Sequence, residues 1–151
     1  MTMPFNRKSI NPDDWLKALK GSGGRITEVQ KTLVAILAHS EEPLSAEQVW
    51  ESARQSRPET GRATVYRTVE KLEALGLLRR VHGYQGCSRF VPAVPESLML
   101  FVCLVCGQAL YLDRQPLQSL MAQTERNSGH DISEYRLELF GTCTTCRRIT
   151  T

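Results

Sequence analysis

The sequence predicts an α+β chain, with an N-terminal winged helix-turn-helix domain followed by a small C-terminal α/β domain. In the first half, segments with helical periodicity precede one alternating segment that contains glycine turns, which is the order of a winged helix. In the second half, two Cys-x-x-Cys pairs enclose strand-like and helix-like segments. A chain of 151 residues accommodates two compact domains of about 70 to 85 residues. We therefore predict domains at 1–91 and 97–151, joined by a hinge at 92–96.

Capping signals define the first three helices. The first begins at Asn11-Pro12, an N-cap followed by a first-turn proline, and ends in the glycine cluster at 21–24. The next two, over 27–40 and 45–55, begin at capping boxes, in which a Thr or Ser precedes a Gln by three positions. The two boxes are Thr27 with Gln30 and Ser45 with Gln48.

A fourth helix is predicted over 62–76, because its apolar residues recur at helical spacing and Gly76 is placed to terminate it. The segment at 77–92 then alternates and turns at Gly83 and Gly86, as expected of the β-hairpin that forms a wing. The apolar stripe of the fourth helix consists of Val65, Val69, Leu72 and Leu75, and the opposite face carries Arg62, Thr64, Tyr66, Arg67 and Lys71.

Strands and one helix are predicted beyond the proline-containing linker at 91–96. We expect one strand leading into Cys103, further strands over 108–112 and 132–140, and a helix over 116–127 that ends at a Ser128-Gly129 turn. A domain this small has a limited apolar core, so an additional staple is expected to stabilise it.

The composition is that of a soluble cytoplasmic protein. Hydrophobic residues make up 41% of the sequence and charged residues 23%, and we find neither an apolar run long enough to cross a bilayer nor a signal-peptide pattern. The net charge of +3 is uneven, since residues 1–91 hold 14 basic and 10 acidic side chains against 5 and 6 in the remainder. A polyanionic partner should therefore bind the front half, although ordinary surface charge explains such an excess equally well.

Four of the five cysteines form two close pairs, Cys103 with Cys106 and Cys143 with Cys146. In a reducing cytoplasm such pairs more often hold zinc than form disulfides. Because Zn²⁺ prefers four tetrahedral thiolates, the pairs predict one structural zinc ion per chain, with no open coordination position. A reversible disulfide pair is the alternative, and a redox switch could act on top of the zinc site.

The polar face of the fourth helix carries side chains suited to reading DNA. An α-helix fits the major groove, where Arg and Lys contact phosphates and Arg, Thr or aromatic side chains contact base edges. The winged-helix order of the elements favours this interpretation. The alternative is an ordinary solvated surface on which Tyr66 covers the core.

The stretch "GRATVYRTVEKLEALGLL" at 61–78 resembles the recognition helix of the ferric uptake regulator (Fur) superfamily. The resemblance includes "SAEQVW" at 45–50, Arg25-Ile26-Thr27 and both cysteine pairs, and covers about residues 14–148. It implies a transcriptional repressor rather than an enzyme, with a C-terminal dimerisation domain, acting as a homodimer on double-stranded DNA. The implied operator is A·T-rich and palindromic, and the four paired cysteines match those that bind a structural zinc in the family.

The resemblance also implies which side chains touch DNA. Tyr66 and Arg67 lie within the helix and contact bases and backbone, and Arg62 and Thr64 lie at its start. Lys20 and Arg25, two basic residues near the first helix, approach the phosphates or the minor groove. Gln30 departs from the family pattern, which commonly has an arginine there.

The regulatory metal site of the family is degenerate in this sequence. Positions where the family has histidine or glutamate ligands hold residues that bind metals poorly, namely Pro43, Gln85, Ser97, Leu98, Leu100, Tyr111 and Tyr135. We expect four of these, Leu98, Leu100, Tyr111 and Tyr135, to pack together and hold the hinge by burial. DNA binding should then need no second metal.

Cys87 is a candidate for a replacement sensor. It lies near His82 in the sequence, and Arg80 and Arg89 could lower its pKa. Three alternatives stay open: a zinc sensor that uses Cys87 and His82, a thiol or haem sensor that uses Cys87, and a metal-independent paralogue controlled by a protein partner. The simplest interpretation of Cys87 is an inert thiol in the wing.

Overall fold

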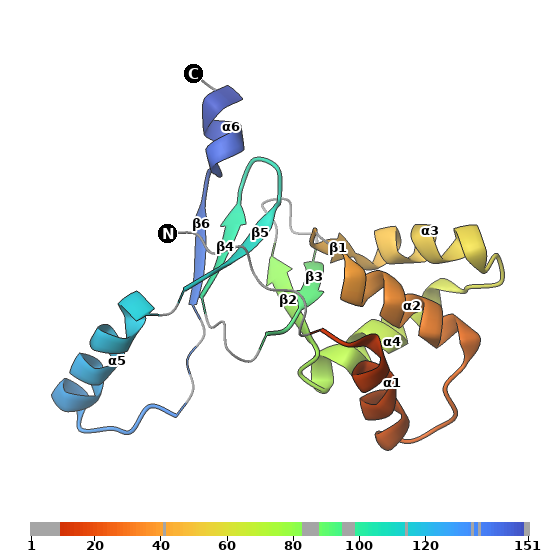
Figure 1. Ribbon diagram of the computed structural model, residues 1–151, viewed down its shortest axis with the longest axis horizontal. Coiled ribbons are helices and arrows are strands. Elements are labelled where there is room, and N and C mark those ends of the chain that lie inside the picture. Colours follow the sequence, from red (N-terminus) through yellow and green to blue (C-terminus); the bar gives the residue numbers. More distant parts are fainter. Residues whose placement is uncertain are drawn as a thin grey trace. The chain divides into compact units, whose positions relative to one another are not determined.

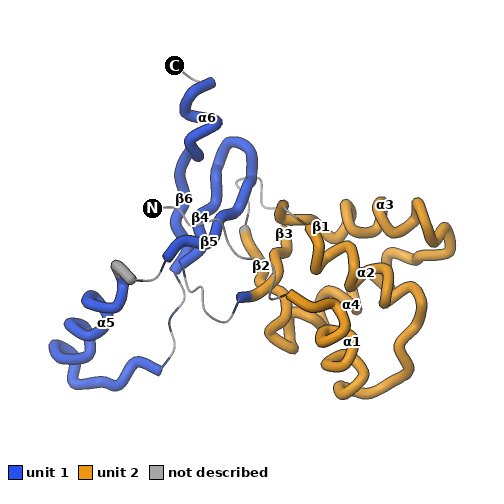
Figure 2. The backbone as a smooth tube through the Cα atoms, viewed as in Figure 1, with its two compact units in different colours: residues 1–6, 94–151 blue, residues 7–93 orange. Residues whose placement is uncertain are grey.

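The computed structural model describes residues 10–40, 42–82, 88–94, 99–113, 115–133, 135 and 137–149. Two compact units can be distinguished, one of residues 7–93 and one of residues 94–151 together with 1–6 (Figure 2). The described elements of the first unit are four helices and a three-stranded sheet, and those of the second are a three-stranded sheet and two helices (Figure 1). None of the described helices combines the length and the apolar character that crossing a bilayer requires.

The first unit has the predicted helices and hairpin plus one short strand that was not predicted. Strands β2 and β3 pair antiparallel from Leu78 opposite Pro92 to His82 opposite Ser88, and the expected turn residues 83–87 lie outside the described residues. Strand β1 pairs with β3 and is too short to show an alternating pattern. The elements are α1 (Pro12–Gly21), α2 (Glu28–His39), β1 (Leu44–Ser45), α3 (Ala46–Ser56), α4 (Arg62–Ala74), β2 (Leu78–His82) and β3 (Ser88–Pro92).

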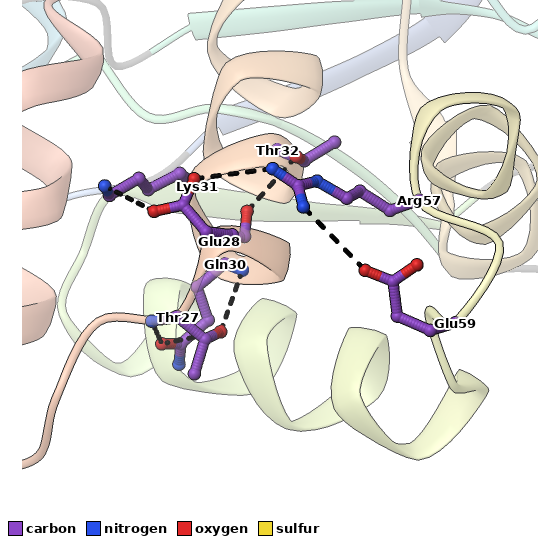
Figure 3. Close-up of polar contacts among 7 residues, drawn as sticks. All are labelled: Thr27, Glu28, Gln30, Lys31, Thr32, Arg57 and Glu59. Carbon is purple, nitrogen blue, oxygen red and sulfur yellow. Dashed lines mark hydrogen bonds and ion pairs between the residues drawn. The ribbon is translucent and has the colours of Figure 1, made fainter.

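The three predicted helix caps are confirmed. Oδ1 of Asn11 accepts a hydrogen bond from the backbone N–H of Asp13 at 3.0 Å. In both capping boxes the hydroxyl oxygen accepts from the Gln backbone N–H at 3.2 Å, and the Gln side-chain oxygen accepts from the N–H of the first residue at 2.9 to 3.0 Å. These contacts satisfy N–H groups that the first helical turn leaves without a partner. The boxes join Thr27 with Gln30 (Figure 3) and Ser45 with Gln48.

One hydrophobic cluster holds the first unit together. From α4 it receives Val65, Val69 and Leu72, each at most 1% exposed, which confirms this part of the predicted stripe. The prediction for Leu75 was wrong: this side chain is 37% exposed because the helix ends before it and it occupies the C-cap. Gly76 then turns the chain with a φ of +70°, which a glycine adopts without strain. The cluster also contains Trp15, Leu19, Leu33, Val34, Leu37, Ala38, Ala46, Val49, Ala53, Leu78 and Phe90.

The replacement Ser45→Ala tests how much one capping box stabilises this unit. The variant loses the hydrogen bond from the Gln48 N–H, and we expect the free energy of unfolding to fall by about 1 kcal/mol. Urea unfolding followed by tryptophan fluorescence measures the change. Ser56→Ala is the matched control, because Ser56 is the last residue of the same helix and caps no N–H group. Equal losses in the two variants would contradict the capping role.

The second unit is a three-stranded sheet of order β5-β4-β6 with two helices. The central strand β4 pairs antiparallel with β5 and parallel with β6. It is buried along nearly its whole length, as expected for a strand with a neighbour on each side. The elements are β4 (Met99–Cys103), β5 (Ala109–Leu112), α5 (Gln115–Ser128), β6 (Leu137–Gly141) and α6 (Thr144–Ile149).

Two predictions for the second unit need correction. The last strand was expected over 132–140 but begins at Leu137. Residue 132 does not join the sheet because its backbone N–H donates to Oε1 of Glu125 on α5, at 3.2 Å. Helix α6 was not predicted, since six residues are too few to show a helical period. The hinge expected at 92–96 begins at Pro92, the last residue of β3, and residues 95–98 lie outside the described residues, so the domain boundaries stay a prediction.

Candidate metal centre and nucleic-acid interface

The two cysteine pairs converge in the second unit. The Sγ atoms of Cys103, Cys106, Cys143 and Cys146 all lie within 4.8 Å of one another, and none of these residues is in a disulfide. Cys103 is 1% exposed, Cys143 and Cys146 are each 7% exposed, and Cys106 faces solvent. The fold therefore gathers four thiols, three of them buried, around one point.

The parallel pairing of β4 and β6 explains why the pairs meet. Cys103 ends β4 opposite Gly141, which ends β6, so the turns that follow the two strands leave the same edge of the sheet. The N–H of Leu104 donates to the carbonyl of Gly141 at 2.8 Å and holds the two turns side by side. In the first turn Gly107 has a φ of +74°, a conformation that favours glycine.

Backbone groups point at the sulfurs of this cluster. The pKa of the Cys103 thiol is lowered to about 6 by hydrogen bonds from the backbone N–H groups of Cys106 and Cys143. The second of these is 3.3 Å long, and the N–H of Cys146 likewise donates to Sγ of Cys143 at 3.4 Å. A hydrogen bond between the side chains of Cys146 and Cys143, together with burial, raises the pKa of the Cys146 thiol to about 12. The Cys103 thiolate therefore forms readily here, and a cation among the sulfurs would favour ionisation of the Cys146 thiol.

The dimensions of the cluster suit zinc. Zn–S bonds of about 2.3 Å place the sulfurs of a regular tetrahedron about 3.8 Å apart. The Sγ atoms of Cys106 and Cys143 are separated by 3.9 Å, close to this edge length. Four sulfurs within 4.8 Å of one another therefore need only small adjustments to enclose one zinc ion, and four protein ligands leave no position for a substrate.

The structure describes some of the positions at which the family has its regulatory metal ligands. Leu100 is fully buried and lies opposite Tyr111 in the β4–β5 pairing, and both Tyr111 and Tyr135 are half-buried. The expected packing with Leu98 stays a prediction. Within the described ranges, the four cysteines are the one group of three or more potential metal ligands whose donor atoms converge. Three of the degenerate positions lie outside these ranges, namely Gln85, Ser97 and Leu98.

The proposed replacement sensor lies outside the described residues. This applies to Cys87 and to the side chain of His82, so a sensor built from them stays a hypothesis. Arg80, one of two arginines that the sequence places near Cys87, donates two hydrogen bonds to the Glu73 carboxylate at 3.0 and 2.7 Å. Its guanidinium also lies 5.3 Å from the centre of the Phe90 ring. Arg80 therefore ties the wing to α4.

Helix α4 presents a polar face to solvent. Tyr66 is 50% exposed, so the alternative in which it covers the core is wrong. Lys71 donates from Nζ to the carbonyl of Gly23 at 3.1 Å, which ties the connection between α1 and α2 to this helix. Of the residues predicted to contact DNA, Thr64 is half-buried and the other five are exposed, namely Lys20, Arg25, Arg62, Tyr66 and Arg67.

The departure at Gln30 has a structural explanation, because this side chain caps α2 as described above. Figure 3 shows its neighbours at the start of the helix. Glu28 accepts a hydrogen bond from Lys31 at 2.7 Å, which lowers the pKa of the Glu28 carboxyl, and its other oxygen lies 3.4 Å from Nη2 of Arg57. This end of α2 is therefore occupied by contacts within the unit.

Two residues that contact Arg62 were missed by the sequence analysis. Nη2 of Arg62 donates to Oε1 of Glu47 at 2.6 Å, and the guanidinium lies 4.2 Å from the centre of the Trp50 ring. The ion pair joins residues 15 positions apart on different helices, so local patterns could not indicate it. The presence of both Glu47 and Trp50 in "SAEQVW" was the available signal.

The second unit exposes many large apolar side chains, and they come from both outer strands, both helices and the first cysteine turn. Phe140 is 50% exposed and Leu120 51% exposed. Exposed apolar side chains that form a contiguous patch mark interaction sites. The members are Leu104, Val105, Leu110, Leu120, Leu139, Phe140 and Ile149, which we call the apolar surface of the second unit.

Comparison with known proteins shows the family to which the chain is related. The model of the ferric uptake regulator family matches residues 21–140. The ferric uptake regulation protein of Bacillus subtilis (strain 168) is 32% identical over 135 residues, covering 86% of this chain and 90% of the relative. A zinc-bound manganese uptake regulator is 25% identical with a TM-score of 0.68, covering 85% and 98% of the two chains. The ferric uptake regulator Fur of Helicobacter pylori has a TM-score of 0.77 at 20% identity, with 97% of each chain covered.

A winged-helix unit followed by a second, mixed unit is thus the fold of known metal-responsive regulators. The chain belongs to the ferric uptake regulator family. Members of this family are transcription regulators and not enzymes, and the same holds for this chain.

Proposed function

We propose that the chain is a homodimeric, sequence-specific DNA-binding repressor that acts in the cytoplasm and holds one structural zinc ion per chain. The observation that carries this proposal is the solvent-facing side of α4, where Tyr66 and Arg67 project from a helix whose other side is buried in the core. Side chains with these groups contact base edges and phosphates when a helix enters the major groove. The membership of the family supports the same assignment.

Each proposed DNA contact has a position in the first unit. Tyr66 and Arg67 read bases and contact the backbone from α4, with Arg62 and Thr64 at the start of the helix. Lys20, in the last turn of α1, and Arg25, in the connection that Lys71 ties to α4, approach phosphates or the minor groove. Phosphate contacts set the register on the duplex, whereas base contacts select the sequence.

The zinc ion would be held by Cys103, Cys106, Cys143 and Cys146. When bound, it supplies a closed tetrahedral link between the ends of β4 and β6. The cysteines position the two turns, and the backbone N–H groups that point at the sulfurs stabilise thiolate charge. The role is structural, since a domain with a small core gains folding free energy from such a link.

The second unit would form the dimer. Its exposed apolar side chains suit contact with a second copy of the chain, which would cover them in the dimer. A twofold dimer presents two copies of α4, which matches a palindromic operator. An A·T-rich operator follows from the family resemblance. In this assignment residues 1–91 bind DNA, 92–96 form the hinge and 97–151 dimerise.

The regulatory metal site would be degenerate. Where ligands are expected, Leu100 is buried in the sheet and Tyr111 lies opposite it, and neither side chain is a good metal ligand. The zinc-loaded dimer should therefore bind its operator without a second metal. A zinc, thiol or haem sensor at Cys87 and His82, or control by a protein partner, are the alternatives, and unchanged regulation in Cys87→Ser would exclude the sensor.

Selection of duplexes from a random-sequence library tests the proposed function. The zinc-loaded protein should enrich a palindromic duplex, and two chains should bind one duplex in a mobility or anisotropy assay. The same protein should bind a scrambled duplex of equal composition at least about a thousandfold more weakly. Recovery of no common sequence, or equal binding to both duplexes, would contradict a sequence-specific regulator.

A further inference from the structure

Arg62 is restrained on two sides although it lies at the surface. Its Nη2 atom donates to Oε1 of Glu47 at 2.6 Å, and its guanidinium carbon lies over the Trp50 ring, 4.2 Å from the ring centre. An exposed arginine ordinarily samples many rotamers. The ion pair and the ring contact together restrict the positions that the guanidinium can adopt.

Trp50 is itself fixed, so the support is rigid. Its Nε1–H donates to the carbonyl of Thr60 at 2.9 Å, just before α4 begins, and the ring packs against the hydrophobic cluster of the first unit. Glu47 stands in the first turn of α3, where a carboxylate is favoured by the positive helix end. Both supporting residues thus belong to α3, and Arg62 is the first residue of α4.

The contacts leave Arg62 able to bind a further acceptor. A guanidinium has five N–H donors, and the hydrogen bond to Glu47 uses one of them. The side chain remains 59% exposed, so the other donors can be reached from solvent. The N-terminal residues of a helix in the major groove are those closest to base edges. A restrained guanidinium at this position loses less conformational freedom when it binds than a mobile one.

We propose that Glu47 and Trp50 are positioning residues, which hold Arg62 so that it reads a base in the operator. This inference rests on the proposed DNA-binding function and adds a specificity device to it. In this role Glu47 acts through Arg62 and not through a DNA contact of its own, and its negative charge repels phosphates. Glu47 should therefore increase the preference for the operator over other sequences. Its negative charge should at the same time lower the affinity of the protein for DNA of any sequence.

The test compares specific and non-specific binding of full-length, zinc-loaded protein. The probes are the duplex recovered by selection and a scrambled duplex of the same composition. Glu47→Gln removes the charge at nearly constant shape, and we expect the ratio of the two affinities to fall about three- to tenfold. Binding to the scrambled duplex should stay equal or become tighter, because a negative charge is lost.

Two further variants isolate the role of the ion pair between Glu47 and Arg62. Glu51→Gln removes the same charge from the same helix, and Glu51 forms no ion pair with another described residue. It should shift both affinities alike and leave their ratio unchanged. In an Arg62→Gln background, Glu47→Gln should have no further effect on the ratio, since a positioning residue acts only through the residue that it holds.

A measurement without DNA separates this inference from the proposed function. The side-chain Nε–H signal of Arg62 in a ¹⁵N relaxation experiment should be rigid in the unaltered protein and mobile in Glu47→Gln. A mobile Arg62 in the unaltered protein, or an unchanged affinity ratio in Glu47→Gln, would overturn the positioning role while leaving the regulator intact. Failure of the unaltered protein to prefer any duplex would overturn the proposed function, and the positioning role with it.

Discussion

Cys143→Ser is expected to prevent zinc binding and to destabilise the second unit strongly. Cys143 is buried, its sulfur lies 3.9 Å from that of Cys106, and it accepts a hydrogen bond from the Cys146 N–H in α6 at 3.4 Å. Its loss therefore opens the cage and the junction of β6 with α6. Structural zinc contributes about 10 kcal/mol or more to the folding of small zinc domains. We therefore expect this unit to lose more than about 3 kcal/mol of stability.

The two tryptophans allow the units to be followed separately. Both Trp15 and Trp50 lie in the first unit, so their fluorescence reports on that unit alone, whereas far-ultraviolet circular dichroism reports on the whole chain. In Cys143→Ser, circular dichroism should show an early loss during urea unfolding while the fluorescence transition stays near its original midpoint. Cys87→Ser is the control and should keep one zinc per chain. Full zinc content in Cys143→Ser would contradict the cage.

The double replacement Tyr66→Ala and Arg67→Ala should abolish operator binding without affecting the fold. Both side chains are exposed on α4, so their truncation removes little from the core. Each base or phosphate contact contributes about 1 to 3 kcal/mol, and a dimer makes each contact twice, so affinity should fall by at least about a hundredfold. Anisotropy titration with the selected duplex measures this loss.

A neighbouring variant controls for general effects on the helix. Glu70 is exposed on α4, one turn beyond Tyr66, and carries a negative charge. Glu70→Gln should leave operator affinity equal or slightly increased. If the double variant bound the operator as tightly as the unaltered protein, α4 would not be the helix that reads DNA.

Local sequence signals predicted most of the first unit. Both capping boxes and the Asn11 cap place their hydrogen bonds within three residues of one another, so the chain itself specifies where these helices begin. The antiparallel wing was predicted because alternation and glycine turns are also local. Leu75 was misplaced because helical spacing continues through the C-cap, while the helix does not.

Features that depend on distant partners could not be predicted. The short strand β1 exists only through its pairing with β3, and the late start of β6 depends on a contact between residue 132 and Glu125. The cysteine spacing predicted a cluster, but the parallel β4–β6 pairing that closes it is a property of the fold. The support of Arg62 by Glu47 and Trp50 likewise requires two helices to be brought together.

Native mass spectrometry of the complex with the selected duplex tests the central claim most directly. The protein should be purified reduced and without added metal, then mixed with DNA. We predict one species that contains two chains, two zinc ions and one duplex, formed without further metal. A complex that carries four metal ions, or that forms only after iron, manganese or additional zinc is supplied, would contradict the proposal of a structural zinc with a degenerate regulatory site.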